Sequence, residues 1–177
     1  MANKPRIYLD SCCFIDAVKE AVGTLPTDRV NDAWFIKKFF EAHLAGEIII
    51  HTSILSVAEC VAIEPGQSNV PQEAQERFRA FLTSGQYVQL LSPTPATVIH
   101  VQKFRWEHGL VLAGADALHF AAALERGCIE FITTDNRLKA PKIAKSMPVL
   151  STLGLRLIRA SDTAYLPEKY RQGVLHA

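Results

Sequence analysis

The chain has 177 residues, of which 49% are hydrophobic and 21% are charged; this balance is typical of one globular domain and excludes a disordered chain. The formal net charge is +1, so the chain as a whole is neither a basic nucleic-acid coat nor an acidic tail. Residues 1–135 carry 11 basic and 16 acidic side chains, and residues 136–177 carry 8 basic and 2 acidic ones. This separation of charge indicates an acidic site beside a basic surface.

In chain order we expect a strand at 6–10, a helix at 11–22, a loop at 24–30, a helix at 31–45, a strand at 47–51, a helix from 52 or 53 onward, a loop at 64–71, a helix at 71–85, a strand at 87–91, helices at 95–108 and 115–126, a strand at 130–135, a basic loop or broken helix around Pro141 at 137–146, and a strand at 155–158. This alternation predicts a single α/β domain in which helices flank a mostly parallel, five-stranded sheet. We place the domain at residues 1–160 and a C-terminal tail at 161–177.

No run of about 18 apolar residues is present, so we expect no membrane span. The N-terminus resembles no secretory signal, because its apolar stretch is short and ends at Asp10. The four cysteines form no CxxC pair, which favours small buried thiols over a zinc site or disulfides. Together these features predict a cytoplasmic protein.

Two acidic residues stand at the carboxyl ends of predicted strands, namely Asp10 and Asp135. Ligands of open parallel sheets bind beyond these ends, so the two carboxylates share a crevice if their strands are neighbours. Glu59 lies in the otherwise apolar segment ILSVAECVA, and Asp116 is the second residue of the segment ADALHFAAA. Burying an unpaired carboxylate in such surroundings costs several kcal/mol, so both acids are candidates for a paired or metal-bound site.

Four carboxylates from four separate elements are suited to bind one or two hard divalent cations, such as Mg²⁺ or Mn²⁺. A cation relieves the repulsion among the carboxylates, lowers the pKa of a bound water and stabilises charge on a phosphoryl oxygen. The pattern therefore indicates phosphodiester hydrolysis. Taken singly, each acid has another interpretation, since Asp10 and Asp135 could cap helices and Asp116 could favour the first turn of its helix.

Four segments, LDSCCFID at 9–16, SVAEC at 56–60, ADALHFAAA at 115–123 and FITTDNRL at 131–138, resemble the four acidic blocks of PIN domains. Their order and their residues are most similar to those of the VapC-type toxins, which are prokaryotic ribonucleases. The resemblance spans residues 6 to 158. It implies a PIN-like fold and a metal-dependent endoribonuclease in which water attacks the RNA phosphodiester in line, leaving 5′-phosphate and 3′-hydroxyl products.

The resemblance also implies roles for individual residues. Asp10, Asp116 and Asp135 correspond to direct metal ligands, and Glu59 to a further acid that binds the metal, a metal-bound water or a proton. Ser11 corresponds to the small hydroxyl residue that hydrogen-bonds a metal-bound water or a substrate phosphate. This chain departs from the family at two positions, where Cys12 stands in place of a polar Asn or Ser and Asn136 in place of a further acid.

A basic segment follows Asp135 and is suited to hold RNA phosphates without sequence specificity. Its members are Arg137, Lys139, Lys142 and Lys145, with Arg156 and Arg159 further along. The same residues could instead form a solvated face or dock an acidic antitoxin segment. His119 lies one turn after Asp116, where we expect it to support the site or to pack rather than to bind the metal.

The resemblance implies three partners, which are an RNA substrate, a second copy of the chain in a homodimer, and a small antitoxin that blocks the acidic crevice. A different class of function stays open as the alternative, namely a catalytically inactive PIN-like module that binds RNA or protein. The presence of all four acids favours the nuclease.

Overall fold

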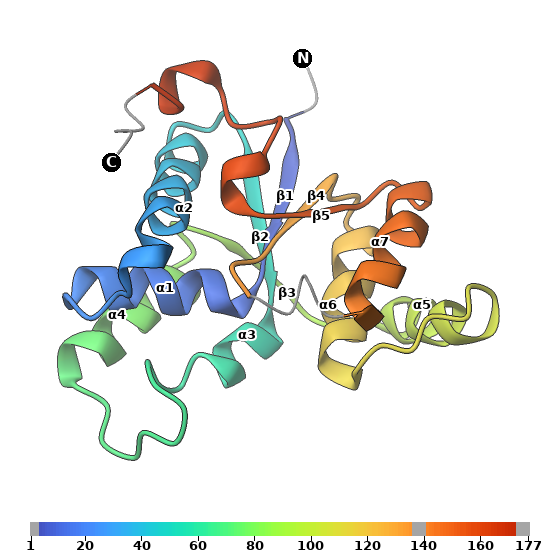
Figure 1. Cartoon of the computed structure of the whole chain (residues 1–177), viewed down its shortest axis with the longest axis horizontal. Helices are drawn as coiled ribbons and strands as arrows, with labels where there is room; N and C mark the ends of the chain where they lie inside the picture. Colours follow the sequence, from blue (N-terminus) through green and yellow to red (C-terminus); the bar gives the residue numbers. More distant parts are fainter. Residues whose placement is uncertain (1–3, 136–140, 173–177) are drawn as a thin grey trace.

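The computed structural model describes residues 4–135 and 141–172. Its core is one sheet of five parallel strands in the order β3-β2-β1-β4-β5 (Figure 1). The strands are β1 (Arg6–Leu9), β2 (Ile49–Ser53), β3 (Gln89–Leu91), β4 (Glu130–Ile132) and β5 (Arg156–Ile158). The prediction of a five-stranded parallel sheet in one α/β domain is confirmed.

Helices flank the sheet on two sides, with α1, α2 and α4 on one side and α5, α6 and α7 on the other (Figure 1). The helices are α1 (Ser11–Ala21), α2 (Val30–Leu44), α3 (Ile54–Glu59), α4 (Gln72–Thr83), α5 (Pro95–Trp106), α6 (Gly114–Glu125) and α7 (Pro141–Thr152). Short 3-10 turns lie at η1 (Thr27–Arg29), η3 (Ala160–Asp162) and η4 (Glu168–Tyr170). None of the described helices is both long and apolar enough to cross a membrane.

The strand β1 shows how the sequence builds a core on each side of the sheet. Successive side chains of a strand point to opposite faces, so Ile7 and Leu9 pack into one apolar cluster with Phe14 and Phe39. Tyr8 packs into the other cluster, which α6 and α7 complete. Every residue of β1 after Arg6 is buried, which explains why the sequence of this short strand is almost entirely apolar.

Neighbouring strands bring distant polar residues to one edge of the sheet. β1 pairs with β4 so that Leu9 is opposite Ile132, and the backbone N–H of Asp10 donates to the Ile132 carbonyl at 3.0 Å. Asp10 and the residues that follow β4 therefore lie side by side at the carboxyl edge. This adjacency is the condition under which the sequence predicts a shared crevice.

The helix α7 corrects the prediction of a basic loop or broken helix at 137–146. Its described part is a continuous helix from Pro141 to Thr152, with Pro148 inside it. Pro141 suits a first helical position, where no backbone N–H is needed. Pro148 faces outward while Leu150 is fully buried, and this burial opposes the helix-breaking effect of the proline. Residues 137–140 lie outside the described residues.

The segment predicted as a tail packs against the domain over residues 161–172. Leu166 is buried in the core cluster of α1 and α2. The Thr163 hydroxyl donates to Glu130 at 2.6 Å, and the Ala164 N–H donates to the same carboxylate at 3.1 Å. Glu130 itself is fully buried in β4, so this end of the chain is anchored to an inner strand of the sheet.

Candidate functional site

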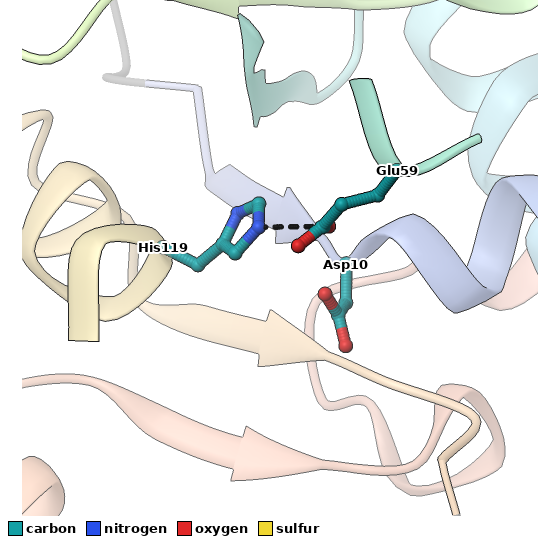
Figure 2. Close-up of side chains that lie close together, drawn as sticks. All are labelled: Asp10, Glu59 and His119. Carbon is teal, nitrogen blue, oxygen red and sulfur yellow. Dashed lines mark hydrogen bonds and ion pairs between the residues drawn. The ribbon is translucent and has the colours of Figure 1, made fainter. Parts of the chain in front are cut away.

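Asp10, Glu59 and His119 converge at the carboxyl edge of the sheet. Their candidate metal-ligating atoms lie within 4.8 Å of one another. Asp10 directly follows β1, Glu59 ends α3, and His119 lies in α6; Figure 2 shows His119 and Glu59 meeting beside Asp10. The carboxylate oxygens of Asp10 and Glu59 are the kind of donor that Mg²⁺ and Mn²⁺ prefer, so the described residues fit a hard divalent cation.

The carboxylate of Asp10 is held by donors on both of its oxygens. Oδ1 accepts the backbone N–H of Ser11 at 2.8 Å and the Ser11 hydroxyl at 3.4 Å. Oδ2 accepts the Thr133 hydroxyl at 2.9 Å and the Cys12 thiol at 3.3 Å. The bond to the Ser11 N–H makes Asp10 the N-cap of α1. The same side chain therefore caps the helix and belongs to the candidate site.

Glu59 lies in different surroundings from those that its neighbours in the sequence suggest. The helix α3 ends at Glu59, and the side chain is 35% exposed rather than enclosed by apolar groups. Because the helix stops there, the expectation of an apolar environment for this acid is wrong. Its Oε2 lies within hydrogen-bond distance of His119 Nε2, at 3.0 Å.

His119 is buried and connects Glu59 to the centre of the sheet. Its Nδ1 lies 2.7 Å from the Tyr8 hydroxyl, and the backbone N–H of Ser53 donates to the same hydroxyl at 2.8 Å. Burial, and to a lesser degree the charge of Asp10, raise the pKa of the Tyr8 phenol above its ordinary value. The phenol is therefore protonated at neutral pH and has a hydrogen to donate.

The other two predicted acids lie outside this group of three. Asp116 is in the first turn of α6, three residues before His119, and is partly exposed. Asp135 follows β4, is partly exposed, and donates its backbone N–H to the Thr133 hydroxyl at 3.2 Å. The structure thus brings Asp10 and Glu59 together directly and places Asp116 and Asp135 on neighbouring elements.

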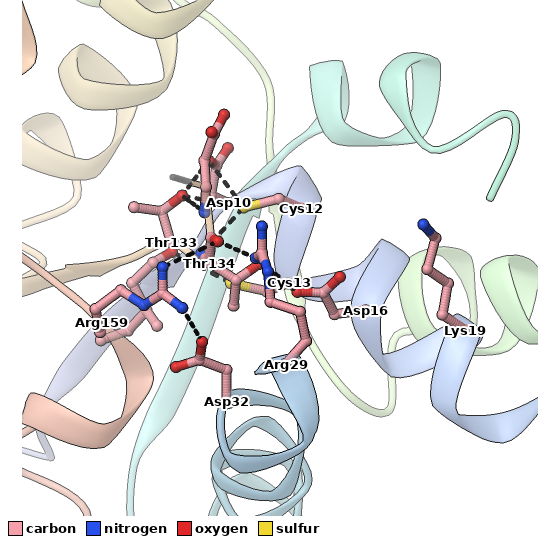
Figure 3. A network of polar contacts seen from close by, with 12 residues as sticks. Asp10, Cys12, Cys13, Asp16, Lys19, Arg29, Asp32, Thr133, Thr134 and Arg159 are labelled. Carbon is pink, nitrogen blue, oxygen red and sulfur yellow. Dashed lines mark hydrogen bonds and ion pairs between the residues drawn. The ribbon is translucent and has the colours of Figure 1, made fainter. Parts of the chain in front are cut away.

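A network of charged groups fixes the chain just before Asp135 (Figure 3). The carbonyl of Thr134 accepts from two guanidinium groups, those of Arg29 and Arg159. Arg29 also pairs with Asp16 at 3.3 Å, and Arg159 pairs with Asp32. Burial raises the pKa of Asp16 above its ordinary value. Two arginines on one carbonyl restrain the turn that carries Asp135.

This network bears on the predicted RNA contacts. Arg159 is engaged with Asp32 and Thr134, and Arg156 pairs with the buried Glu130 at 3.2 Å. Both arginines thus have partners within the protein, and their contact with RNA phosphates stays a prediction. Among the other predicted contacts, Arg137 and Lys139 lie outside the described residues, and so do the side chains of Lys142 and Lys145 in α7.

Several residues of the site are missing from the sequence-based prediction. Thr133 and Cys12 contact Asp10 and lie 3.0 Å from each other through Oγ1 and Sγ. Thr133 belongs to the predicted block FITTDNRL, and its position two residues before Asp135 is the only local signal for it. Tyr8 and Arg29 carry no such signal, because their contacts with His119 and with the Thr134 carbonyl span more than 100 residues of the chain.

Comparison with known proteins agrees with this fold. The sequence model of the PIN domain matches residues 7–144. A chain of the VapBC2 complex from Rickettsia felis, bound to a DNA fragment from their promoter, superposes with a TM-score of 0.57 at 16% identity over 87% of this chain and 98% of that chain. A chain of FitAB bound to the IR36 DNA fragment superposes with a TM-score of 0.51 at 13% identity over 87% of this chain and 94% of that chain.

No curated protein matches the sequence at a significant level. The two solved structures share the fold with this chain. The PIN match extends over more than three quarters of the chain and includes all four predicted acids. The chain therefore belongs to the PIN domain family.

Proposed function

We propose that this protein is a metal-dependent endoribonuclease that hydrolyses RNA phosphodiester bonds and acts as the toxin of a toxin–antitoxin pair. The observation that carries the proposal is the convergence of Asp10 and Glu59 at the carboxyl edge of a PIN-domain sheet, with candidate ligand atoms within 4.8 Å. Clustered carboxylates repel one another, and a bound divalent cation removes that repulsion.

In this proposal Asp10, Asp116, Asp135 and Glu59 hold Mg²⁺ or Mn²⁺. Such a cation, when bound, lowers the pKa of a water ligand and stabilises negative charge on the phosphoryl group. Asp10 is oriented for this task by the donors on its two oxygens. Glu59 is exposed, and its Oε1 is suited to accept the proton of a water that attacks the phosphorus. Attack by water leaves a 5′-phosphate and a 3′-hydroxyl.

The remaining parts of the proposal concern the substrate and the partners. Arg137, Lys139, Lys142 and Lys145 would hold RNA phosphates beside the acidic site, and the Ser11 hydroxyl would contact a phosphate or a water of the cation. The names of the two similar structures, VapBC2 and FitAB, describe complexes. They support a small antitoxin as partner, and we further propose a homodimer that works in the cytoplasm.

The test is the cleavage of total RNA by the purified, antitoxin-free protein with Mg²⁺, with Mn²⁺ or with EDTA. We expect cleavage that needs the cation and that is lost in Asp10→Asn and in Asp116→Asn. Asp162→Asn is the matched control, because this carboxylate is exposed at the far end of the chain. Full activity of both site variants would refute the assignment of these acids.

The same experiment separates the nuclease from the alternative, a PIN-like module that binds RNA or protein without cutting it. A folded protein that binds no Mn²⁺ in calorimetry and cuts no RNA under any condition would refute the metal-dependent nuclease and favour the binding module. End labelling of the products checks the chemistry, since attack by a ribose 2′-hydroxyl would leave a cyclic phosphate instead of a 3′-hydroxyl.

A further inference from the structure

A chain of hydrogen bonds runs from the backbone of β2 to the exposed end of Glu59. The Ser53 N–H donates to the Tyr8 hydroxyl at 2.8 Å. The Tyr8 hydroxyl lies 2.7 Å from His119 Nδ1, and His119 Nε2 lies 3.0 Å from Glu59 Oε2. Tyr8 and His119 are buried, while Glu59 is 35% exposed. The interior of the sheet thus contacts the candidate metal site through one histidine ring.

The direction of every bond in this chain follows from its first member. A backbone N–H can only donate, so the Tyr8 oxygen accepts from Ser53. The phenol has one hydrogen. The Thr52 hydroxyl also lies near the phenol, but it donates to the Leu9 carbonyl and is hydrogen-bonded to Ser56, so His119 Nδ1, at 2.7 Å, is the acceptor of the phenol hydrogen. A neutral imidazole with an accepting Nδ1 carries its hydrogen on Nε2. That hydrogen points to the carboxylate of Glu59.

The opposite arrangement is unfavourable at both ends. A hydrogen on Nδ1 would leave the Tyr8 hydroxyl without an acceptor in this chain. It would also direct the lone pair of Nε2 at a carboxylate oxygen 3.0 Å away. Buried polar groups are costly to leave unpaired, so the contacts select one tautomer of His119.

Packing holds the rings in this arrangement. The Tyr8 ring stacks on Phe131 with centroids 4.8 Å apart and an angle of 12° between the rings. The rings of Tyr8 and His119 meet edge to face, with centroids 5.9 Å apart. Because rings packed in this way have little freedom to turn, the donor on Nε2 keeps its direction.

We propose that His119 is a positioning residue that holds Glu59 through its Nε2–H and does not bind the metal. This inference rests on the proposed function, because Glu59 is one of the acids assigned to the cation. A protonated ring nitrogen has no lone pair for a metal, so the proximity of His119 to Asp10 and Glu59 reflects its hold on Glu59. The bond engages Oε2 and leaves Oε1 to face the cation or its water. Outer-shell groups of this kind set the orientation of ligands in many metal sites.

Two variants of similar shape separate a donor from a packing group. Both His119→Gln and His119→Met place a long unbranched side chain in the cavity, but only glutamine can donate to Glu59 and accept from Tyr8. We expect His119→Met to weaken Mn²⁺ binding in calorimetry, and to lower kcat for RNA cleavage, by about 10- to 100-fold. We expect His119→Gln to restore at least a large part of both losses. Equal values for the two variants, whether high or low, would overturn the proposal.

The tautomer is observable directly, without RNA and without activity. In two-bond ¹H–¹⁵N correlation spectra of the metal-free protein at neutral pH, we expect His119 to carry its proton on Nε2, and we expect the same after Mg²⁺ is added. In Tyr8→Phe the Nδ1 loses its donor while Glu59 still accepts the hydrogen of Nε2, so we expect the Nε2–H tautomer to remain the major one with a smaller excess than in the wild type. A His119 with an unprotonated Nε2 in the wild-type protein, or one that loses this proton on addition of Mg²⁺, would overturn the proposal.

These readouts distinguish failure of the inference from failure of the proposed function. A wild-type protein that binds Mn²⁺ but cuts no RNA would remove the nuclease assignment, while the spectra and the Mn²⁺ affinities of the two His119 variants would still support or overturn the role of His119. Thermal unfolding of each variant confirms that both are folded before affinities are compared.

Discussion

His51 leads to a quantitative prediction about the pH dependence of folding. It lies in β2, is 2% exposed, and neither ring nitrogen has a hydrogen-bond partner among the described residues. Burial, followed by the positive charges of Arg126 and Arg6, lowers its pKa from 6.5 to about 4. His51 is therefore neutral in the folded protein at any pH well above 4, while it titrates near 6.5 in the unfolded chain.

The sign and the size of the effect follow by linkage. Above about pH 6.5, His51 is neutral in both the folded and the unfolded state, so its ionisation does not change the free energy of unfolding. As the pH falls from 6.5 toward 4, His51 is protonated in the unfolded chain but stays neutral in the folded protein. The free energy of unfolding therefore decreases. The shift from 6.5 to about 4 corresponds to a loss of about 3 kcal/mol in full, of which about 2 kcal/mol develops between pH 7 and pH 5.

The assay is urea unfolding of the wild-type protein and of His51→Leu at several pH values between 7 and 4. Leucine has a volume close to that of histidine and brings no buried polar atoms, so we expect the variant to be at least as stable as the wild type near pH 7. On acidification the wild type should lose about 2 kcal/mol more than the variant by pH 5. Other groups, such as His43 and Asp16, also have shifted pKa values, but they contribute to both proteins and cancel in the difference.

A surface replacement, His108→Leu, is the matched control, because His108 is exposed. Its pH profile should differ from the wild-type profile by much less than that of His51→Leu. Parallel stability curves for the wild type and His51→Leu between pH 7 and pH 4 would refute the reasoning, since they would mean that His51 titrates alike in both states.

Three further predictions concern buried charges and thiols. Glu130→Gln removes the charge that accepts from Arg156, Thr163 and Ala164, and we expect urea unfolding to show a loss of about 3 kcal/mol; a loss below about 0.5 kcal/mol, the range of neutral surface changes, would contradict this. Arg159→Met leaves Asp32 buried without its partner and should cost about 3 kcal/mol, most of which the double variant with Asp32→Leu should recover; additive losses would argue against the pairing. Iodoacetamide should label the folded protein at the partly exposed Cys12 alone, because burial raises the pKa of each of the other three thiols; mass spectrometry of peptides gives the sites, and labelling of a second cysteine would contradict the prediction.

The parts of the fold that local pattern determines are the parts that the sequence predicts. A short apolar run followed by an acid predicts β1 and Asp10, and the same pattern predicts β4 and Asp135, although β4 ends at Ile132, three residues before the acid. Alternation of strands and helices predicts the parallel sheet, because parallel neighbours need a crossover between them. Each of these signals lies within about 15 residues of sequence, so it can be recognised without knowledge of the tertiary structure.

The contacts that orient the site have no such local signal. The hydroxyl of Thr133 reaches Asp10 across a sequence separation of 123 residues, and the pair of Arg159 and Asp32 spans 127. The exposure of Glu59 depends on the residue at which α3 ends. The apolar residues around Glu59 in the sequence give no indication that the helix ends there. Partners of this kind follow from strand order and helix length, which the pattern of residues leaves undetermined.

The surroundings of Asp10 suggest how its carboxylate makes room for a cation. A carboxylate offers about four lone-pair positions, and four donors already approach Asp10. The shortest contacts are from the Ser11 N–H at 2.8 Å and the Thr133 hydroxyl at 2.9 Å, while the Cys12 thiol and the Ser11 hydroxyl are longer, at 3.3 and 3.4 Å. The two longer contacts are the weaker ones, so they are the ones that a bound cation would displace. Displacement would turn the Ser11 hydroxyl away from Asp10 toward a phosphate or a water of the cation, which is the role that the resemblance to PIN domains implies for it.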